Sequence, residues 1–282
     1  MNYKKLTRDI SSYIFLIIVS IISIGPFLWI LSTAFKGPDE NIFSYPPQFL
    51  PNNFTLDNII SVWNKVPFIK YMLNSAIVAG TTVILNLLLS SLAGYALARM
   101  YFKGKNFIFY SVLATIMIPF QVIMIPVYLI VLKLNLVDSV SPLAGYAGLI
   151  LPFSVNAFGI FLMRQAFLGI PKELEEAAII DGCNHFDIWL RVMMPLVIPS
   201  LATLAIFTFV GVWGEFLWPS IVLTNPEMYT LPIGLNDLQG NFSTNWRFIA
   251  AGTVISMIPI IIFFLLMQKQ FLKGSTEGAV KG

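Results

Sequence analysis

The side chains best suited to chemistry are concentrated in one passage, PKELEEAAIIDGCNHFDIWLRVMMP, residues 171–195. The only histidine of the chain, His185, and its only cysteine, Cys183, lie there among several carboxylates. Such groups serve proton transfer and nucleophilic attack. Intramembrane proteases, however, need a Ser–His pair, paired aspartates or an HExxH zinc motif, and the sequence has no second histidine. We therefore expect no catalytic residue and no metal site. His185 should be solvated, and Cys183 should be a small filler.

The sequence also lacks a motif for ATP hydrolysis. ATP hydrolysis requires a GxxxxGK[ST] loop that cradles the phosphates, together with an acid that holds magnesium. The nearest match, Gly104-Lys105-Asn106, lacks the first glycine and the final hydroxyl. A single cysteine gives neither an internal disulfide nor a CxxC site. We therefore expect this chain to be no enzyme and to carry no cofactor of its own.

The elements around this passage are those of a membrane protein. The sequence is 57% hydrophobic and 11% charged, whereas soluble domains are about a quarter charged. A bilayer core requires about 20 apolar residues in a helix. Six segments qualify: 13–35, 71–98, 107–132, 143–165, 199–223 and 247–268. The first is too long for the apolar region of a signal peptide, so we interpret it as a retained span. The net charge of +3 is too small to suggest a nucleic-acid partner.

The lysines and arginines predict how these spans are oriented, because cytoplasmic loops are enriched in them. One side would hold twelve: Lys4, Lys5, Arg8, Arg99, Lys103, Lys105, Arg164, Lys172, Arg191, Lys269, Lys273 and Lys281. The other would hold five: Lys36, Lys65, Lys70, Lys133 and Arg247. We therefore expect both termini and the segment 164–198 in the cytoplasm. Residues 1–70 should form the first span and an external loop, and residues 71–282 the core of the membrane domain.

Local signals in the polar passage predict two short helices. Pro171 suits a first helical turn, and Gly182 suits a helix end in a left-handed conformation. Asn184 can cap the second helix, and Asp187 and Arg191 form an i, i+4 pair on it. Pro195 and Pro199 would end this helix. An exposed amphipathic corner of this kind favours docking of a partner, and the alternative is a solvated loop with capped ends. In the second span, Ser90, Gly94 and Ala98 lie four residues apart, which predicts close helix packing.

The order of residues in the passage resembles the EAA loop of ABC importer permeases. The pattern is Glu176-Ala177-Ala178, Gly182 and then Val192, Met194 and Pro195, where the family usually has Ile and Leu at the positions of Val192 and Met194. Two flanking stretches, STAFKGPDENIFSYPPQFLPNNFTLDNII with YMLNSAIVA and GVWGEFLWPSIVLTN, are similar to the maltose-type, MalG-like permeases of carbohydrate importers. Gly214 stands where those permeases usually have Asn.

This resemblance implies an all-α membrane protein with six transmembrane helices in the type I ABC importer permease fold. It implies a homologous second permease subunit (MalF-like), two cytoplasmic ATPase subunits that bind Mg-ATP, an extracytoplasmic solute-binding protein and a bacterial plasma membrane. The passage would be a coupling helix between spans 4 and 5 that lies in a cleft of the ATPase. The residues expected at that contact are Glu176, Ala177, Ala178, Asp181, Gly182 and Phe186, with the two alanines small because the cleft is narrow and Gly182 as the corner.

Glu215 is the one acid well inside a predicted span. A charge at bilayer depth costs about 2.5–3.5 kcal/mol on insertion scales, so it should face the bundle or a water-filled cavity. Trp213 and Trp218 flank it, and sugars are commonly held by aromatic faces with polar groups. The trio could therefore line the solute path. In the alternative, the second permease subunit satisfies Glu215, and the tryptophans are interface anchors.

The function implied is import of a sugar, in particular an oligosaccharide, by alternating access driven by the separate ATPase. One alternative keeps the architecture and changes the solute, for example to glycerol-3-phosphate or a polyamine. Another is a membrane scaffold with no transport cycle.

Overall fold

The structure is a computed structural model that describes residues 3–236, 238 and 245–277. Those residues are helical apart from loops and one isolated bridge between Lys36 and Phe54. Three helices are long and apolar enough to cross a membrane, and the number rises to six if each of three bent helix pairs is one span. The expected all-α membrane fold is confirmed.

The chain divides into two compact units. One comprises Met1–Phe68 with Gly234–Ile258, and the other comprises Ile69–Ile233 with Pro259–Gly282. The first unit contains α1 (Tyr3–Ala34) and α2 (Asp57–Lys65). The amide of Asn58 in α2 donates to the carbonyls of Ala34 and Lys36, and so holds α2 to the end of α1. The long helix α14 (Trp246–Glu277) has residues in both units.

The loop between α1 and α2 is organised by one carboxylate. Glu40 accepts hydrogen bonds from the backbone N–H groups of Asn53 at 2.8 Å, Asn52 at 3.0 Å and Gly37 at 3.3 Å. The ammonium group of Lys36, which is buried, donates to the carbonyl of Gln48 at 2.6 Å. These bonds give an otherwise irregular, proline-rich segment a defined path.

The second unit is built on α3 (Phe68–Arg99), which is one straight span as predicted. Helix α7 (Ala157–Leu168) crosses it at very short distance. A Cβ at Gly94 of α3 would lie 2.7 Å from the Cβ of Met163, and a Cβ at Gly159 of α7 would lie 2.5 Å from the Oγ of Ser90. Only glycine fits at these two positions. The close packing predicted from Ser90, Gly94 and Ala98 is confirmed at Ser90 and Gly94.

The third predicted span is not one straight helix. Helix α4 (Lys105–Ala114) and the 3₁₀ turn η1 (Thr115–Met117) are bent by 105° from α5 (Phe120–Lys133). The cause is Pro119, because a residue before proline is disfavoured in the helical region. Ile118 accordingly has an extended backbone with φ −93° and ψ 111°. The predicted span over 107–132 is therefore a bent helix pair.

The fourth predicted span is broken as well. Helix α6 (Pro142–Ile150) and the 3₁₀ turn η2 (Leu151–Phe153) are bent by 54° from α7. The break lies at Asn156, which has an extended backbone and caps α7 by accepting the N–H of Gly159 at 2.7 Å. A side-chain cap satisfies a terminal amide, so the helix starts anew there.

The fifth predicted span ends early. Helix α11 (Ile198–Trp213) stops at Gly214, and α12 (Leu217–Val222) starts after a short link, so the segment 199–223 consists of two helices. Glycine is a poor helix former, and Pro219 has no N–H to bond to the carbonyl four residues earlier. The 3₁₀ turn η4 (Pro226–Met228) and α13 (Leu231–Asn236) follow.

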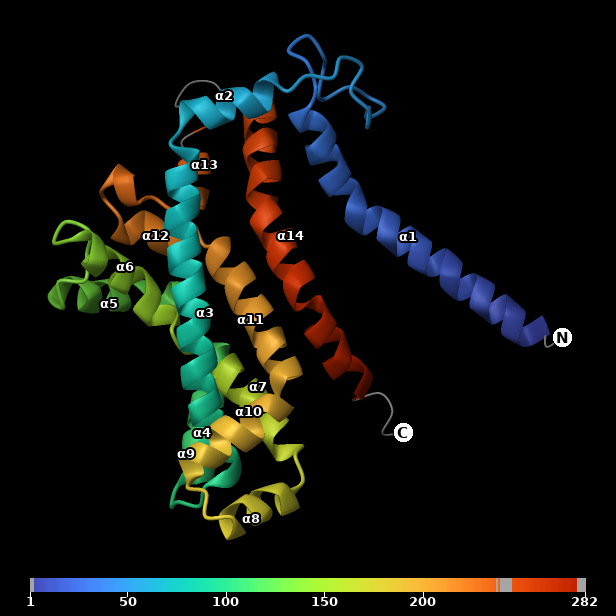
Figure 1. Cartoon of the computed structure of the whole chain (residues 1–282). Helices are drawn as coiled ribbons and strands as arrows, with labels where there is room; N and C mark the ends of the chain where they lie inside the picture. Colours follow the sequence, from blue (N-terminus) through green and yellow to red (C-terminus); the bar gives the residue numbers. More distant parts are fainter. Residues whose placement is uncertain (1–2, 237, 239–244, 278–282) are drawn as a thin grey trace. The chain divides into compact units, whose positions relative to one another are not determined.

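In the described part of the second unit, two apolar clusters lie in the core. The Trp218 cluster joins α3, α5, α6 and α12, and its members include Val78, Val131, Leu149, Trp218 and Val222. The Trp189 cluster joins α3, α7, α8 (Lys172–Ile180) and the start of α11, and its members include Tyr95, Phe167, Ala178, Trp189 and Leu204. In Figure 1, α8 and α9 (His185–Asp187) lie at the α4 end of α3, whereas α12 lies towards the other end.

Candidate functional site

Helix α8 ends in a glycine corner. Gly182 has a positive φ of 82°, a conformation that costs other residues free energy. The N–H of Cys183 donates to the carbonyl of Ala178, and the N–H of Gly182 donates to the carbonyl of Ile179, each at 3.0 Å. This pair of bonds is the Schellman motif, which satisfies the last carbonyls of a helix. The predicted stop at Gly182 is confirmed, whereas Pro171 precedes the helix as its N-cap rather than lying inside it.

The second helix starts where it was predicted. Asn184 caps it by accepting the N–H groups of Phe186 and Asp187 at 2.9 and 3.0 Å. The predicted ion pair between Asp187 and Arg191 is present at 3.5 Å. The helix runs from α9 through a π segment, η3 (Ile188–Met193), into α10 (Met194–Leu196). Pro195 lies within α10, and the helix ends one residue later, at Leu196. The direction changes by 81° only between Leu196 and Ile198.

Helix α8 and the second helix meet at Gly182 and form a helical corner of residues 172–196. The inner side of this helical corner is fixed to the core. Ala178 is 7% exposed and Trp189 is 3% exposed, and both belong to the Trp189 cluster. Ala178 therefore packs inside this chain, whereas the resemblance placed it at the contact with the ATPase. Cys183, half-buried, packs against the same cluster as the expected small filler.

A buried cation also holds the corner. The Arg99 side chain at the end of α3 lies 3.6 Å from the Glu175 carboxylate of α8. It also donates to the carbonyls of Phe167 and Ile170, at the end of α7 and just beyond it. The Tyr95 hydroxyl lies 3.3 Å from Nδ1 of His185, which is exposed as expected but bonded. Sequence reasoning used Arg99 only to orient the span and did not single out Tyr95, because nothing local links either residue to the passage.

The outer side of the corner is exposed. We define its outer face as Glu176, Ala177, Ile179, Ile180 and Phe186, all of them exposed. Ile180 is 86% exposed and Phe186 is 60% exposed. Large apolar side chains that are exposed together on one corner are typical of a protein contact. Ile179 and Ile180 were not singled out from the sequence, because nothing local shows which side of α8 faces the core.

Glu215 lies in the link between α11 and α12 rather than inside a helix. Its Oε1 accepts the N–H of Trp218 at 3.1 Å, so the carboxylate helps to start α12. Irregular backbone at membrane depth is tolerated where it is buried in protein or lines a cavity. Glu215 is half-buried in this link, and the backbone there is not that of a continuous helix.

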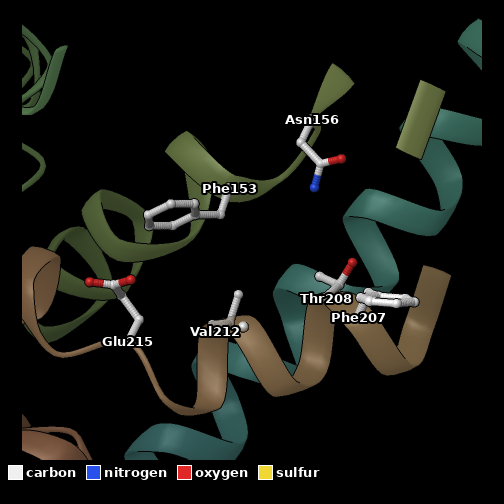
Figure 2. Close-up of a pocket in the computed structure, with 7 residues that line it drawn as sticks. Phe153, Asn156, Phe207, Thr208, Val212 and Glu215 are labelled. Atoms are coloured by element: carbon white, nitrogen blue, oxygen red, sulfur yellow. The ribbon is translucent and has the colours of Figure 1, made fainter. Parts of the chain in front are cut away.

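A pocket of about 200 Å³ lies beside Glu215. Figure 2 shows Phe153, Asn156, Phe207, Thr208 and Val212 around it, and Gly211 completes the lining. The predicted aromatic partners of Glu215 are absent from this lining. Trp218 is fully buried and donates from its indole N–H to the carbonyl of Gly148, and Trp213 is 4% exposed and stacked on Phe209. Both tryptophans are core residues, and Phe153 and Phe207 supply the aromatic rings instead.

The family of the chain follows from comparison with known proteins. Residues 86–275 match the family described as the inner membrane component of binding-protein-dependent transport systems. These residues contain the glycine corner, the outer face and the pocket. The chain belongs to this family, and it is a multi-pass inner-membrane permease subunit of an ABC importer.

Relatives of similar length support this membership over nearly the whole chain. The arabinooligosaccharides transport system permease protein AraQ of Halalkalibacterium halodurans is 38% identical over 284 residues, which cover 99% of this chain and 100% of that protein. The diacetylchitobiose uptake system permease protein DasC of Streptomyces coelicolor is 34% identical, with 91% of each chain covered.

A solved structure shares the fold. It belongs to a bacterial ABC transporter involved in the import of the acidic polysaccharide alginate, with a TM-score of 0.81 and 24% identity over 96% of this chain and 99% of that one. The expected type I ABC importer permease fold is confirmed.

Proposed function

We propose that this chain imports a sugar, of the oligosaccharide class, by alternating access driven by a separate ATPase. The names of the two relatives given above refer to arabinooligosaccharides and to diacetylchitobiose. The observation that carries the proposal is the helical corner of residues 172–196. Its inner side is fixed to the core by Arg99 and the Trp189 cluster, and its outer face is exposed. A rigid element of this kind can pass a displacement from a bound partner to the spans.

The partner of the outer face is a cytoplasmic ATPase subunit, one of two in the complex. Glu176 and Ala177 make the central contact, with Phe186 at its edge, and Gly182 sets the angle between the helices. Asp181, which is exposed beside Gly182, adds a polar group at the rim. Both termini and this corner then lie in the cytoplasm. A homologous second permease subunit and an extracytoplasmic binding protein complete the complex.

Glu215 lies on the solute path in this proposal. The half-buried Glu215 carboxylate lines a pocket between apolar helices, and ionisable groups at membrane depth mark solute pathways by default.

The test is reconstitution. The chain is copurified with its associated subunits, placed in proteoliposomes and supplied with the binding protein. We expect the binding protein loaded with a neutral oligosaccharide to stimulate ATP hydrolysis and to drive uptake of that sugar. Absence of any copurifying ATPase, or stimulation without uptake of any sugar, would overturn the proposal.

A cationic solute such as a polyamine is the second candidate, because the Glu215 carboxylate forms no ion pair with the described lysines and arginines. Uptake of labelled putrescine in place of sugar would favour it.

A further inference from the structure

A buried hydroxyl in the wall of the pocket has no partner. Thr208 is 7% exposed, and its Oγ1 has no hydrogen-bond partner within the described part of the chain. The hydroxyls of Thr203 and Thr253, also inside helices, donate to the carbonyl four residues earlier. Figure 2 shows the Thr208 hydroxyl on the side that faces Asn156. Buried polar atoms are almost always hydrogen-bonded, so this hydroxyl is suited to a group that enters the pocket.

Two further groups line the pocket. Oδ1 of Asn156 accepts the N–H of Gly159, which fixes the amide so that its NH₂ group points towards Thr208 (Figure 2). One oxygen of Glu215 accepts the N–H of Trp218, and the carboxylate keeps further capacity to accept. The pocket therefore offers an amide donor, a hydroxyl and a carboxylate acceptor.

The remaining lining is apolar and partly aromatic, from Phe153, Phe207, Gly211 and Val212. A sugar ring has apolar C–H faces and hydroxyl groups at its edge, so it matches rings combined with a few polar groups. The volume of about 200 Å³ is below the roughly 300–1,000 Å³ of pockets that enclose a drug-sized ligand. One sugar residue fits at a time.

We propose that Asn156, Thr208 and Glu215, with Phe153 and Phe207, form a subsite for one residue of a neutral sugar chain that excludes sugar acids. This inference rests on the proposed function and specifies its substrate class. A uronate residue would bring its carboxylate against that of Glu215, and like charges placed together strongly disfavour binding. Neutral hydroxyls would instead donate to Glu215.

Gly211 allows a direct probe of this subsite. A Cβ there would meet nothing within 4 Å, so Gly211→Cys places a thiol in the pocket without a clash. The native thiol, Cys183, is removed by Cys183→Ser in this variant. Labelling of the complex in proteoliposomes with a maleimide, without binding protein, is followed on this chain. The added sugars are glucose with glucuronate and galactose with galacturonate, pairs that differ only at one carbon.

We expect at least one neutral sugar to slow labelling at position 211, and its acid to need roughly tenfold higher concentration for the same effect. Adding Glu215→Gln should remove this difference between sugar and acid. The wild-type chain, labelled at Cys183, should show no protection by any sugar. Failure of every neutral sugar to protect, equal protection by the acids, or protection by putrescine instead would overturn the subsite. Sugar uptake by the wild-type complex is measured in parallel, so loss of the subsite alone leaves the proposed function standing.

Discussion

The guanidinium of Arg99 lies 3.6 Å from the carboxylate of Glu175, and the two side chains are only 4% and 12% exposed. The same guanidinium group donates to the carbonyls of Phe167 and Ile170. One cation therefore joins the end of α3, the end of α7 and helix α8. The corner that presents the outer face is thus held by a buried ionic contact as well as by apolar packing.

Glu175→Gln should loosen α8. Removing one partner of a buried ion pair leaves the other charge uncompensated, at a cost of about 3–5 kcal/mol. Because Arg99 keeps two carbonyl partners, we expect the lower end of this range. Hydrogen exchange of the α8 amides in the purified complex should speed up, and stimulation of ATPase activity by the loaded binding protein should fall.

The control for Glu175→Gln is Asp187→Asn, which breaks the pair with Arg191. The Arg191 side chain is 76% exposed, and exposed ion pairs contribute about 0–1 kcal/mol. If the two substitutions speed up hydrogen exchange of the α8 amides equally, burial of the Arg99 contact does not contribute to the stability of α8.

Gly182→Val should impair coupling to the ATPase, and the only cause should be strain in the backbone at position 182. Gly182 has φ 82° and a Cβ there would meet nothing within 4 Å, so the cost is that of a left-handed residue, about 1–2 kcal/mol. We expect the complex to lose much of its binding-protein-stimulated ATPase activity, whereas Gly182→Asn should retain it because asparagine tolerates this conformation.

Gly104→Val provides a matched control, since Gly104 has φ 83° and the same open surroundings but lies outside the corner. It should leave the stimulation unchanged. Full stimulation of ATPase activity in Gly182→Val would show that coupling does not depend on the conformation of Gly182.

Gly94→Ala should force α3 and α7 apart. The added Cβ would lie 2.7 Å from Cβ of Met163 and 2.8 Å from the backbone nitrogen of Arg164, and overpacking of this kind costs about 1–3 kcal/mol. The thermal unfolding midpoint of the complex should fall. Gly80→Ala, on the same helix with nothing within 4 Å of the new Cβ, should leave the midpoint unchanged or raise it. A midpoint for Gly94→Ala that matches the Gly80→Ala value would refute the close contact.

The loop between α1 and α2 should loosen in acid. Burial alone would raise the pKa of Glu40, but hydrogen bonds from the backbone of Asn53, Asn52 and Gly37 and the charge of Lys36 outweigh it and hold this pKa below the ordinary 4.5. A lowered carboxyl pKa stabilises the fold above the unfolded pKa, and the effect is lost as the pH falls through the folded pKa. Protease cleavage within residues 37–53 should therefore increase below about pH 4. Glu40→Gln should be cleaved readily at neutral pH and show little further change in acid.

The helical corner was predictable because its signals are local. Gly182, Asn184 and the Asp187–Arg191 pair each act within four residues, and each has the predicted geometry. The breaks in the spans were missed because hydropathy records composition and not direction. Ile118-Pro119 and the cap at Asn156 were signals that apolar composition concealed.

Contacts between distant segments could not be predicted from spacing. Nothing near Arg99 indicates Glu175, and nothing in the order of Ala177 and Ala178 tells which one faces the core. Trp213 and Trp218 pack in the core and not in the lining of the Glu215 pocket, because closeness in sequence does not fix the direction of a side chain. The chain turns at Gly214, and the pocket is completed by Phe153 and Asn156, which come from a different helix pair.

The central claim is that the outer face of the helical corner contacts the ATPase, and crosslinking from two adjacent residues tests it most directly. Ala177 is exposed, whereas Ala178 is 7% exposed and packed in the Trp189 cluster. A photoreactive side chain is placed at position 177 or at position 178 in the full complex, and the products are identified by mass. Crosslinks from position 177 to the ATPase subunit, with crosslinks from position 178 only within this chain, are predicted. No ATPase product from position 177 in a complex that hydrolyses ATP would contradict the account.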